Sequence, residues 1–235
     1  MSFSLYLIPS FLSEEQSAED IPAVVRETIK HLRCFFVENE KAARAVLKKM
    51  QPALNIQECT LYPLNEQTNL KEAQESFSVL LKQNVGLLSE SGCPCVADPG
   101  SELVLWAHQN NVRVVPLAGA SSILLALMAS GLNGQNFAFN GYLPKDKEER
   151  CKKIKALEKR SLTEGQTQIF MDTPYRAQHV FEDILRSCSS DTLLCLACDL
   201  TSPKENIKTL PIEKWRQLNP ALSKKEVLFL IEKKG

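Results

Sequence analysis

The sequence predicts an α/β protein with two domains. Short apolar segments alternate with amphipathic segments as far as about Pro116, a pattern typical of a mostly parallel sheet. After about Gly131 the pattern changes to several strands with only two helices between them, which indicates a mixed sheet. A chain of 235 residues has room for one large domain or two small ones. We therefore expect an N-terminal α/β domain over residues 1–116 and a C-terminal mixed α/β domain over residues 117–235.

The elements of the N-terminal half follow from the spacing of apolar residues. Short, mainly apolar segments predict strands at residues 3–8, 34–37, 60–64, 85–88 and 112–117, of which 60–64 is the weaker. The run at 85–88 has no polar alternation, as expected of a strand covered on both faces, and 112–117 is a second buried strand. Helical spacing predicts helices over residues 21–32, 41–50, 70–83 and 101–111. The helix over 41–50 has a loosely amphipathic face of Ala42, Ala45, Val46 and Lys49. The apolar positions of the helix over 70–83 are Leu70, Ala73, Phe77, Leu80 and Leu81.

The C-terminal half begins with a strongly apolar helix over residues 123–130, which we expect to end at Gly131. Strands are predicted at residues 136–140, 168–171, 192–200 and 227–232. Two further helices cover residues 147–160 and 175–188, and the first of these is rich in charged residues. The boundary between the two domains falls near residues 116–120.

Two loops follow predicted parallel strands and form the candidate site. Residues 89–100 combine glycines, prolines and small polar residues, and residues 118–122 form a small-residue turn. Ligands of open α/β sheets bind at the carboxyl ends of the strands, where glycine and serine allow close approach to the backbone. Each loop leads into a helix, whose free N–H groups can bind an anion. Asp98 is either a turn residue that caps the following helix or a functional group.

Composition restricts the class of protein. The chain carries 28 basic and 28 acidic residues, which argues against binding nucleic acid through bulk charge but leaves room for a local basic face. We expect no membrane span, because no apolar run reaches the roughly 20 residues required. The first residues lack the pattern of a signal peptide, so we expect a cytoplasmic protein with reduced cysteines. Cys195 and Cys198 have CxxC spacing, but on a buried strand they would point to opposite faces; we expect core packing and no metal.

Several segments together resemble the tetrapyrrole (corrin/porphyrin) methylase family. They are SESGCPCVADPGSELV at residues 89–104, VRVVPLAGASSILLALMASGL at 112–132 and GYLP at 141–144. Similarity continues in the same order from about Leu5 to Glu232. Within the family, the segments are most similar to the branch that methylates the 2′-oxygen of a cytidine in small-subunit ribosomal RNA.

The resemblance implies a methyltransferase that holds S-adenosylmethionine (AdoMet) in the cleft between two α/β domains, usually as a homodimer. Carried over position by position, it assigns cofactor contacts to Pro9, Glu90, Ser91, Gly92, Cys95, Ser121, Ser122, Met171, Leu200 and Thr201. Methyl transfer from a sulfonium is an in-line displacement that depends mainly on positioning. This explains why no catalytic dyad is readable, and we assign no catalytic residue. Ribosomal small-subunit RNA is the implied substrate.

The chain departs from the family's pattern at two places, the first of which is a loop that faces the substrate cleft in relatives. Residues 9–14 contain no glycine, although the corresponding loop of relatives usually does. Residues 37–41 keep Glu38 but lose the Asp, Thr and Arg of the family's pattern. Two alternatives therefore stay open. One is a methylase of a small, tetrapyrrole-like molecule, and the other is a degenerate relative that binds AdoMet, or nothing, without catalysis.

A cluster of basic residues flanks the GYLP segment. These side chains could meet RNA phosphates, or they could form an ordinary solvated surface: Lys145, Lys147, Arg150, Lys152, Lys153, Lys155, Lys159 and Arg160.

Overall fold

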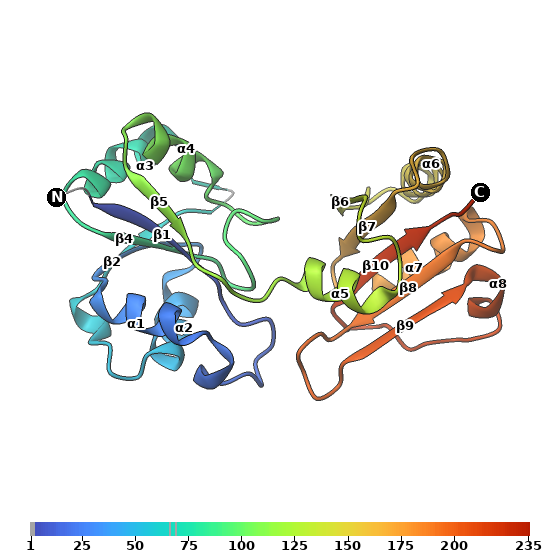
Figure 1. Cartoon of the computed structure of the whole chain (residues 1–235), viewed down its shortest axis with the longest axis horizontal. Coiled ribbons are helices and arrows are strands. Elements are labelled where there is room, and N and C mark those ends of the chain that lie inside the picture. The colour runs from blue at the N-terminus through green and yellow to red at the C-terminus, as the bar shows by residue number, and fades with distance from the viewer. Residues whose placement is uncertain (1–2, 66, 69) are drawn as a thin grey trace. The chain divides into compact units, whose positions relative to one another are not determined.

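The computed structural model describes residues 3–65, 67, 68 and 70–235. The chain divides into two compact units, unit 1 at Met1–Ser121 and unit 2 at Ser122–Gly235. Each unit has its own sheet and its own core (Figure 1). The predicted fold class is confirmed: the sheet of unit 1 is parallel throughout and the sheet of unit 2 is mixed.

Unit 1 has a five-stranded parallel sheet in the order β3-β2-β4-β1-β5. Its strands are β1 (Ser4–Ile8), β2 (Cys34–Val37), β3 (Thr60–Pro63), β4 (Val85–Leu88) and β5 (Arg113–Pro116). Its α-helices are α1 (Ala23–His31), α2 (Glu40–Met50), α3 (Leu70–Phe77) and α4 (Ser101–Gln109). Short 3₁₀ helices complete the unit: η1 (Ala18–Asp20), η2 (Ile56–Glu58) and η3 (Ser78–Leu81).

Helices cover both faces of this sheet. α1 and α2 pack on one face and α3 and α4 on the other (Figure 1). In β2, Phe35 belongs to the first core and Phe36 to the second, so both faces of the strand are buried. The ring of Phe36 meets Phe77 of α3 edge-on, with centroids 5.5 Å apart. Burial on both faces explains why the central strands read as apolar runs without polar alternation.

Three details of unit 1 differ from the sequence-based expectation. The predicted inward face of α2 is wrong: its buried residues are Ala43, Leu47 and Met50. Leu47 and Met50 remove more apolar area from water than the alanines of the predicted face. The strand over 112–117 is not fully buried, because β5 is an edge strand whose ends are exposed.

The predicted helix over 70–83 is α-helical only as far as Phe77 and continues as η3. The hydroxyls of Ser76 and Ser78 donate to the carbonyls of Ala73 and Glu75, at 2.6 and 2.8 Å. Such local bonds compete with the regular helix. Leu81 is 52% exposed rather than inward, while Leu80 is buried. The side chain of Leu70 lies outside the described residues.

Unit 2 has a five-stranded mixed sheet in the order β6-β7-β10-β8-β9. β6 and β7 pair in parallel, and the other neighbours are antiparallel. The strands are β6 (Phe137–Tyr142), β7 (Thr167–Asp172), β8 (Leu193–Cys198), β9 (Asn206–Pro211) and β10 (Val227–Glu232). The helices are α5 (Ser122–Ser130), α6 (Lys147–Glu164), α7 (Ala177–Ser187) and α8 (Ile212–Trp215). β9 and α8 were not predicted.

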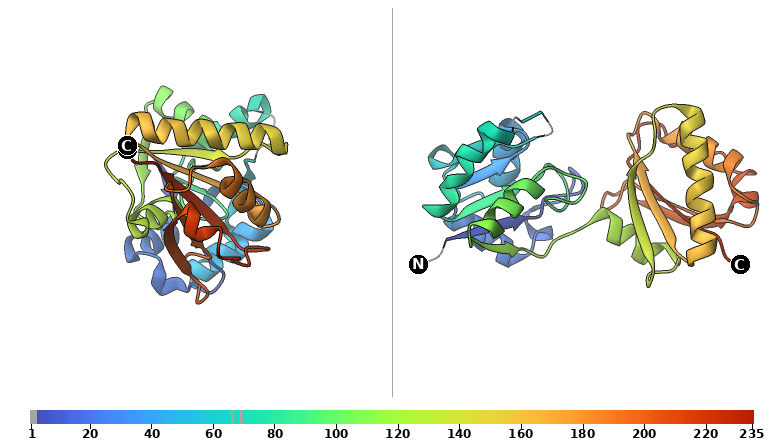
Figure 2. Two further views of the ribbon diagram at one scale, coloured as in Figure 1. Left: turned by 90° about the vertical axis from the view of Figure 1, so that its right-hand side faces the viewer. Right: turned by 90° about the horizontal axis from the view of Figure 1, so that it is seen from above.

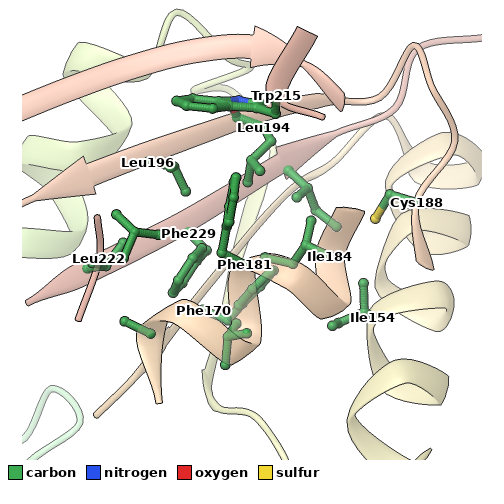
Figure 3. Close-up of a cluster of buried hydrophobic side chains, with 14 of the residues drawn as sticks. Ile154, Phe170, Phe181, Ile184, Cys188, Leu194, Leu196, Trp215, Leu222 and Phe229 are labelled. Carbon is green, nitrogen blue, oxygen red and sulfur yellow. The ribbon is translucent and has the colours of Figure 1, made fainter. Parts of the chain in front are cut away.

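The two faces of this sheet carry separate cores. α6, α7 and α8 pack on one face around Phe170, Phe181 and Phe229 (Figure 3), and the long helix α6 is seen beside the strands in Figure 2. α5 covers the other face with Ile123 and Leu127. We call these the α7 face and the α5 face.

The two cysteines of the CxxC pair point to opposite faces of a buried strand, as predicted. Cys195 lies on the α5 face and Cys198 on the α7 face, and both are buried. Burial raises the pKa of the Cys198 thiol to about 11, so this thiol stays protonated near neutral pH. Within the part of the chain that the structure describes, no group of His, Cys, Asp and Glu residues is arranged to hold a metal ion. Among the same residues, no helix combines the length and the apolar character needed to cross a membrane.

Candidate functional site

Three loops leave the sheet of unit 1 side by side. β1 lies between β4 and β5, with Ile8 opposite Leu88 and Leu7 opposite Pro116. The first loop (residues 9–14), the second loop (89–100) and the third loop (117–121) therefore start together at the carboxyl ends of three neighbouring strands. These strand ends are where α/β proteins bind ligands.

Hydrogen bonds join the first and second loops. The backbone N–H of Ser10 donates to the carbonyl of Gly92 at 2.7 Å, and the N–H of Gly92 donates to the carbonyl of Phe11 at 3.3 Å. The hydroxyl of Ser10, a residue only 1% exposed, donates to the carbonyl of Glu90 at 3.2 Å. These bonds fix the backbone of residues 90–92, while the side chains of Glu90 and Ser91 stay exposed.

The third loop packs against the other two. A Cβ built at Gly119 would overlap Cβ and Cγ of Pro9, so residue 119 has room only for glycine. The thiol of Cys93 donates to the carbonyl of Ala120 at 3.3 Å. Unit 1 therefore brings together Pro9, the segment 90–92 and the backbone that leads directly into Ser121.

The second loop contains several residues in the left-handed backbone region. They are Gly92 (φ +66°), Cys95 (φ +66°), Ala97 (φ +63°) and Gly100 (φ +127°). For Cys95 and Ala97 this conformation costs about 1 kcal/mol each, because their Cβ atoms crowd the backbone. Strain of this kind persists where the surroundings determine the conformation, and it is frequent at functional sites. The thiol of Cys95 itself packs against the α3–α4 core.

Carboxylates gather beside the second loop. The N–H of Glu90 donates to Oε1 of Glu38 at 3.2 Å, at the end of β2. Burial, together with the nearby charge of Glu38 and of Glu90, raises the pKa of the Asp98 carboxyl to about 7. Asp98 is not the N-cap of α4, because Gly100 takes that position without a side-chain bond. The sequence marks Asp98 and Glu38 individually, but only the fold shows that they interact.

The first loop forms its turn without glycine. None of its residues has a positive φ, so none needs glycine's conformational freedom. Phe11 is buried in the α1–α2 core, and the ammonium of Lys49 lies 4.5 Å from the centre of its ring. The side-chain oxygen of Gln16 accepts hydrogen bonds from the N–H groups of Leu12 and Ser13, at 2.7 and 3.2 Å. Packing and side-chain bonds therefore replace the glycine turn of the family's pattern.

The predicted cofactor contacts of unit 2 lie near the carboxyl ends of β7 and β8. Leu228 of β10 pairs with Met171 on one side and Ala197 on the other. Met171 and Leu200 pack into the α5-face core, which also contains Ile123, the neighbour of Ser122. Met171 and Leu200 therefore pack in the same apolar cluster, and Ser122 directly precedes another residue of that cluster.

The turn after β8 positions Thr201. Asp199 and Thr201 both have positive φ, at +49° and +66°. The N–H of Asp199 donates to the carbonyl of Glu226 at 2.9 Å, and the N–H of Glu226 donates to Oδ1 of Asp199 at 3.2 Å. The N–H of Thr201 donates to Oε2 of Glu205 at 2.8 Å. These bonds hold a backbone conformation that is unfavourable for non-glycine residues.

One of the predicted phosphate-contacting residues is assigned wrongly. Arg150 is 6% exposed, and its Nη2 and Nε donate to Oδ2 of Asp183 on α7 at 2.7 and 2.9 Å. Its Nη1 donates to the carbonyls of Pro144 and Lys145. Arg150 therefore joins α6 to α7 and to the GYLP segment, and it does not face solvent. Arg150 is one of many charged residues in this segment, so the sequence does not indicate that it is the one that is buried and paired.

The exposed basic residues of α6 are partly neutralised. Lys152 pairs with Glu149 at 2.8 Å, and Arg160 pairs with Glu164 at 3.1 Å. Lys147, Lys153 and Lys155 are exposed on the same helix. The surface therefore matches the ordinary solvated helix at least as well as a phosphate-binding face.

Comparison with known proteins gives a consistent picture. The sequence profile described as Tetrapyrrole (Corrin/Porphyrin) Methylases matches residues 16–215. Ribosomal RNA small subunit methyltransferase I of Pasteurella multocida is 32% identical over 155 residues, which are 65% of this chain and 54% of that relative. The enzymes of the same name from Buchnera aphidicola (subsp. Acyrthosiphon pisum) and Escherichia coli O157:H7 are 27% and 28% identical over 97% of this chain, covering 78% and 77% of those relatives. The chain thus spans about half the length of the Pasteurella relative.

Solved structures share the fold across both units. Diphthine synthase superposes with a TM-score of 0.65 at 14% identity, covering 99% of this chain and 90% of that one. Uroporphyrin-III-C-methyltransferase from Thermus thermophilus gives a TM-score of 0.56 at 18% identity, covering 97% and 94%. A Thermus thermophilus structure of this enzyme in complex with S-adenosyl homocysteine gives 0.53 at 15% identity, covering 98% and 97%.

Proposed function

The chain belongs to the tetrapyrrole (corrin/porphyrin) methylase family, and from this premise we propose that it is an AdoMet-dependent methyltransferase acting on the ribose 2′-oxygen of small-subunit ribosomal RNA. The observation that carries the proposal is the junction of the three loops. Residues 90–92 are held by hydrogen bonds to the first loop, at the ligand-binding edge of a parallel sheet. The names of the full-length relatives support ribosomal RNA as the substrate.

The residues present fit the cofactor. Gly119 lies against Pro9 and Gly92 lies near Leu12, so the two glycines let the loops pack closely, and Glu90 and Ser91 are exposed beside them. In unit 1 the contacts are Pro9, Glu90, Ser91, Gly92, Cys95 and Ser121. In unit 2 they are Ser122, Met171, Leu200 and Thr201. When bound, AdoMet supplies an electrophilic methyl group on a sulfonium.

Met171 is only partly buried and offers apolar surface suited to the adenine ring, and the buried Leu200 belongs to the same α5-face core. The left-handed backbone at Cys95 and Thr201 fixes the direction of the neighbouring peptide groups.

Asp98 is our candidate for the proton acceptor. A ribose hydroxyl must lose its proton when its oxygen gains a methyl group. The raised pKa of Asp98, about 7, suits a carboxyl that exchanges a proton near neutral pH. Its negative neighbours Glu38 and Glu90 favour uptake of that proton. Replacing Asp98 with Asn should lower kcat at least 100-fold while AdoMet affinity is retained.

The distribution of charge supports RNA over a small molecule. Residues 122–235 carry 18 basic and 14 acidic side chains, whereas residues 1–121 carry 10 basic and 14 acidic ones. The neutral total therefore conceals a basic C-terminal half, which is favourable for a phosphate backbone. The glycine-free first loop is the feature that favours the alternative, a small tetrapyrrole-like substrate. We also propose that the enzyme works as a homodimer in the cytoplasm, the usual arrangement of the family.

Two measurements test the proposal. Calorimetry should detect AdoMet binding to the wild-type chain, and Ser91→Trp should abolish it, whereas the exposed substitution Lys82→Glu should not. Labelled AdoMet should then transfer methyl groups to small ribosomal subunits and not to a panel of tetrapyrrole precursors. Binding without transfer to any substrate would favour a degenerate, non-catalytic relative. Transfer to a tetrapyrrole would favour the small-molecule alternative.

A further inference from the structure

Unit 2 contains a hollow of about 460 Å³ on the α7 face of its sheet. Buried side chains form its floor: Leu196, Cys198, Trp215 and Leu222. Polar side chains form its rim: Asn206, Lys208, Asn219 and Lys225. Its size lies within the range of about 300–1,000 Å³ that is usual for small-ligand sites. None of these residues is assigned to the cofactor.

The walls of the hollow are held in place by tertiary contacts. Nε1 of Trp215 donates to the carbonyl of Leu194 at 2.8 Å, and its ring meets Phe181 edge-on, with centroids 5.8 Å apart (Figure 3). The N–H of Leu222 donates to the side-chain oxygen of Gln178 on α7 at 3.0 Å. A hollow with a fixed floor costs little entropy to occupy, because its side chains are already ordered.

The hollow adjoins residues that we assign to AdoMet. Cys198 ends β8 in its floor, and the turn at Asp199 leads directly to Leu200 and Thr201. Nζ of Lys225, on the rim, lies 3.6 Å from Oδ2 of Asp199. One turn of unit 2 therefore contributes to the floor of the hollow and to the proposed cofactor contacts.

We propose that this hollow binds one nucleotide of a single-stranded segment of the RNA substrate. Lys208 and Lys225 would contact phosphate, and the apolar floor would pack against a base. The exposed amides of Asn206 and Asn219 can hydrogen-bond to the polar edge of that base. The basic excess of residues 122–235 complements the charge of this occupant. The inference rests on the proposed function, in which RNA is the methyl acceptor.

Binding of a fluorescein-labelled single-stranded oligoribonucleotide to the full chain tests the proposal. The double variant Lys208→Glu, Asn219→Asp changes two exposed side chains and should fold normally. We expect RNA affinity to fall at least 10-fold and the slope of log affinity against log salt to decrease by about one. AdoMet affinity, measured by calorimetry, should stay unchanged. In the methylation assay, KM for RNA should rise while kcat is retained.

The control is Lys82→Glu, a charge reversal of an exposed lysine in unit 1, which should change RNA affinity less than 2-fold. Wild-type RNA affinity in the double variant, with methylation intact, would overturn this inference and leave the proposed function standing. A loss in Lys153→Glu on α6 instead would move the RNA path to that helix and overturn the inference. A changed molecular mass of the double variant in light scattering would also overturn it, because the hollow would then be an interface between copies. A wild-type chain that neither binds nor methylates RNA would overturn both proposals.

Discussion

Backbone strain in this molecule coincides with proposed cofactor contacts. Cys95 and Thr201 both have φ of +66°; Cys95 lies in the loop after β4, and Thr201 lies in the turn after β8. Gly92 adopts the same region at no steric cost. The Glu205 carboxylate accepts a hydrogen bond from the N–H of Thr201, and backbone hydrogen bonds to Ser10 and Phe11 hold Gly92. The chain therefore maintains unfavourable conformations at two of the proposed cofactor contacts, where the surrounding hydrogen bonds fix the backbone.

Asp98 should make stability depend on pH. Its pKa is about 7 in the folded chain against an ordinary value of 3.8, so between these pH values the folded state binds more protons than the unfolded state. The free energy of unfolding should therefore fall as pH rises from 4 to 7, with Asp98 contributing on the order of 2 kcal/mol. Asp98→Asn should remove this contribution. Urea unfolding at pH 5 and pH 8 measures it, and an identical pH dependence in the two proteins would contradict the account.

Gly119 should tolerate no side chain. Gly119→Ala introduces a Cβ that overlaps the ring of Pro9, and separating the first and third loops should cost about 2–3 kcal/mol. AdoMet affinity should fall with it. The matched control is Gly134→Ala, where the added Cβ meets no atom within 4 Å. Thermal melts and calorimetry of both variants check the prediction, and equal behaviour of the two would disprove the close contact.

At the scale of elements, α6 packs against the rest of unit 2 with Ile154 and Leu157 and also through the buried ion pair of Arg150 with Asp183. Arg150 donates hydrogen bonds to the Asp183 carboxylate and to two backbone carbonyls of the segment before α6. This pair explains how a helix with so many charged residues packs against a sheet. The remaining basic residues of α6 face solvent, so most of its charged residues serve to keep this surface hydrated.

Arg150→Met should therefore be strongly destabilising. Removing the cation leaves the Asp183 carboxylate buried with only the more distant Arg186, whose Nη1 lies 3.6 Å from Oδ1 of Asp183. We expect a loss of about 3 kcal/mol in urea unfolding. Lys152→Ala, which removes an exposed pair on the same helix, should cost less than about 0.5 kcal/mol. Comparable losses in the two variants would show that Arg150 is no more than a surface residue.

Elements that bury whole apolar runs could be predicted from the sequence, and half-exposed ones could not. β2, β4 and β10 have the predicted bounds, because each is covered on both faces. β9 alternates apolar and polar residues, ends in Pro211 and pairs with β8 alone at the edge of the sheet. Its register places Lys208 opposite Leu196, and no local feature of residues 206–211 indicates that pairing. The inward face of α2 was missed because three alanines and a valine offer several equivalent faces.

The candidate site was predictable only as a set of positions. Loops rich in Gly, Pro and Ser after apolar runs are local features, and the family resemblance assigns residues to them. The bonds between Ser10 and Gly92, and the interaction of Asp98 with Glu38, join residues far apart in sequence. Packing of Phe11 in place of a glycine turn is likewise a tertiary effect. Such features depend on the completed sheet.

At the scale of the whole molecule, the two units differ in charge and in architecture. The acidic unit 1 supplies the loops of a parallel sheet, and the basic unit 2 supplies apolar contacts and a polar-rimmed hollow. This division agrees with the proposed function, in which fixed backbone binds the cofactor and basic side chains bind RNA.

Nucleoside analysis of ribosomal RNA tests the central claim most directly. Small subunits that lack ribose methylation are incubated with AdoMet and the wild-type chain, and their 16S RNA is digested and examined by mass spectrometry. The account predicts one new 2′-O-methylcytidine, formed by the wild-type protein and reduced at least 100-fold with Asp98→Asn. No methylated nucleoside, or a methyl group on a base instead of a ribose, would contradict it.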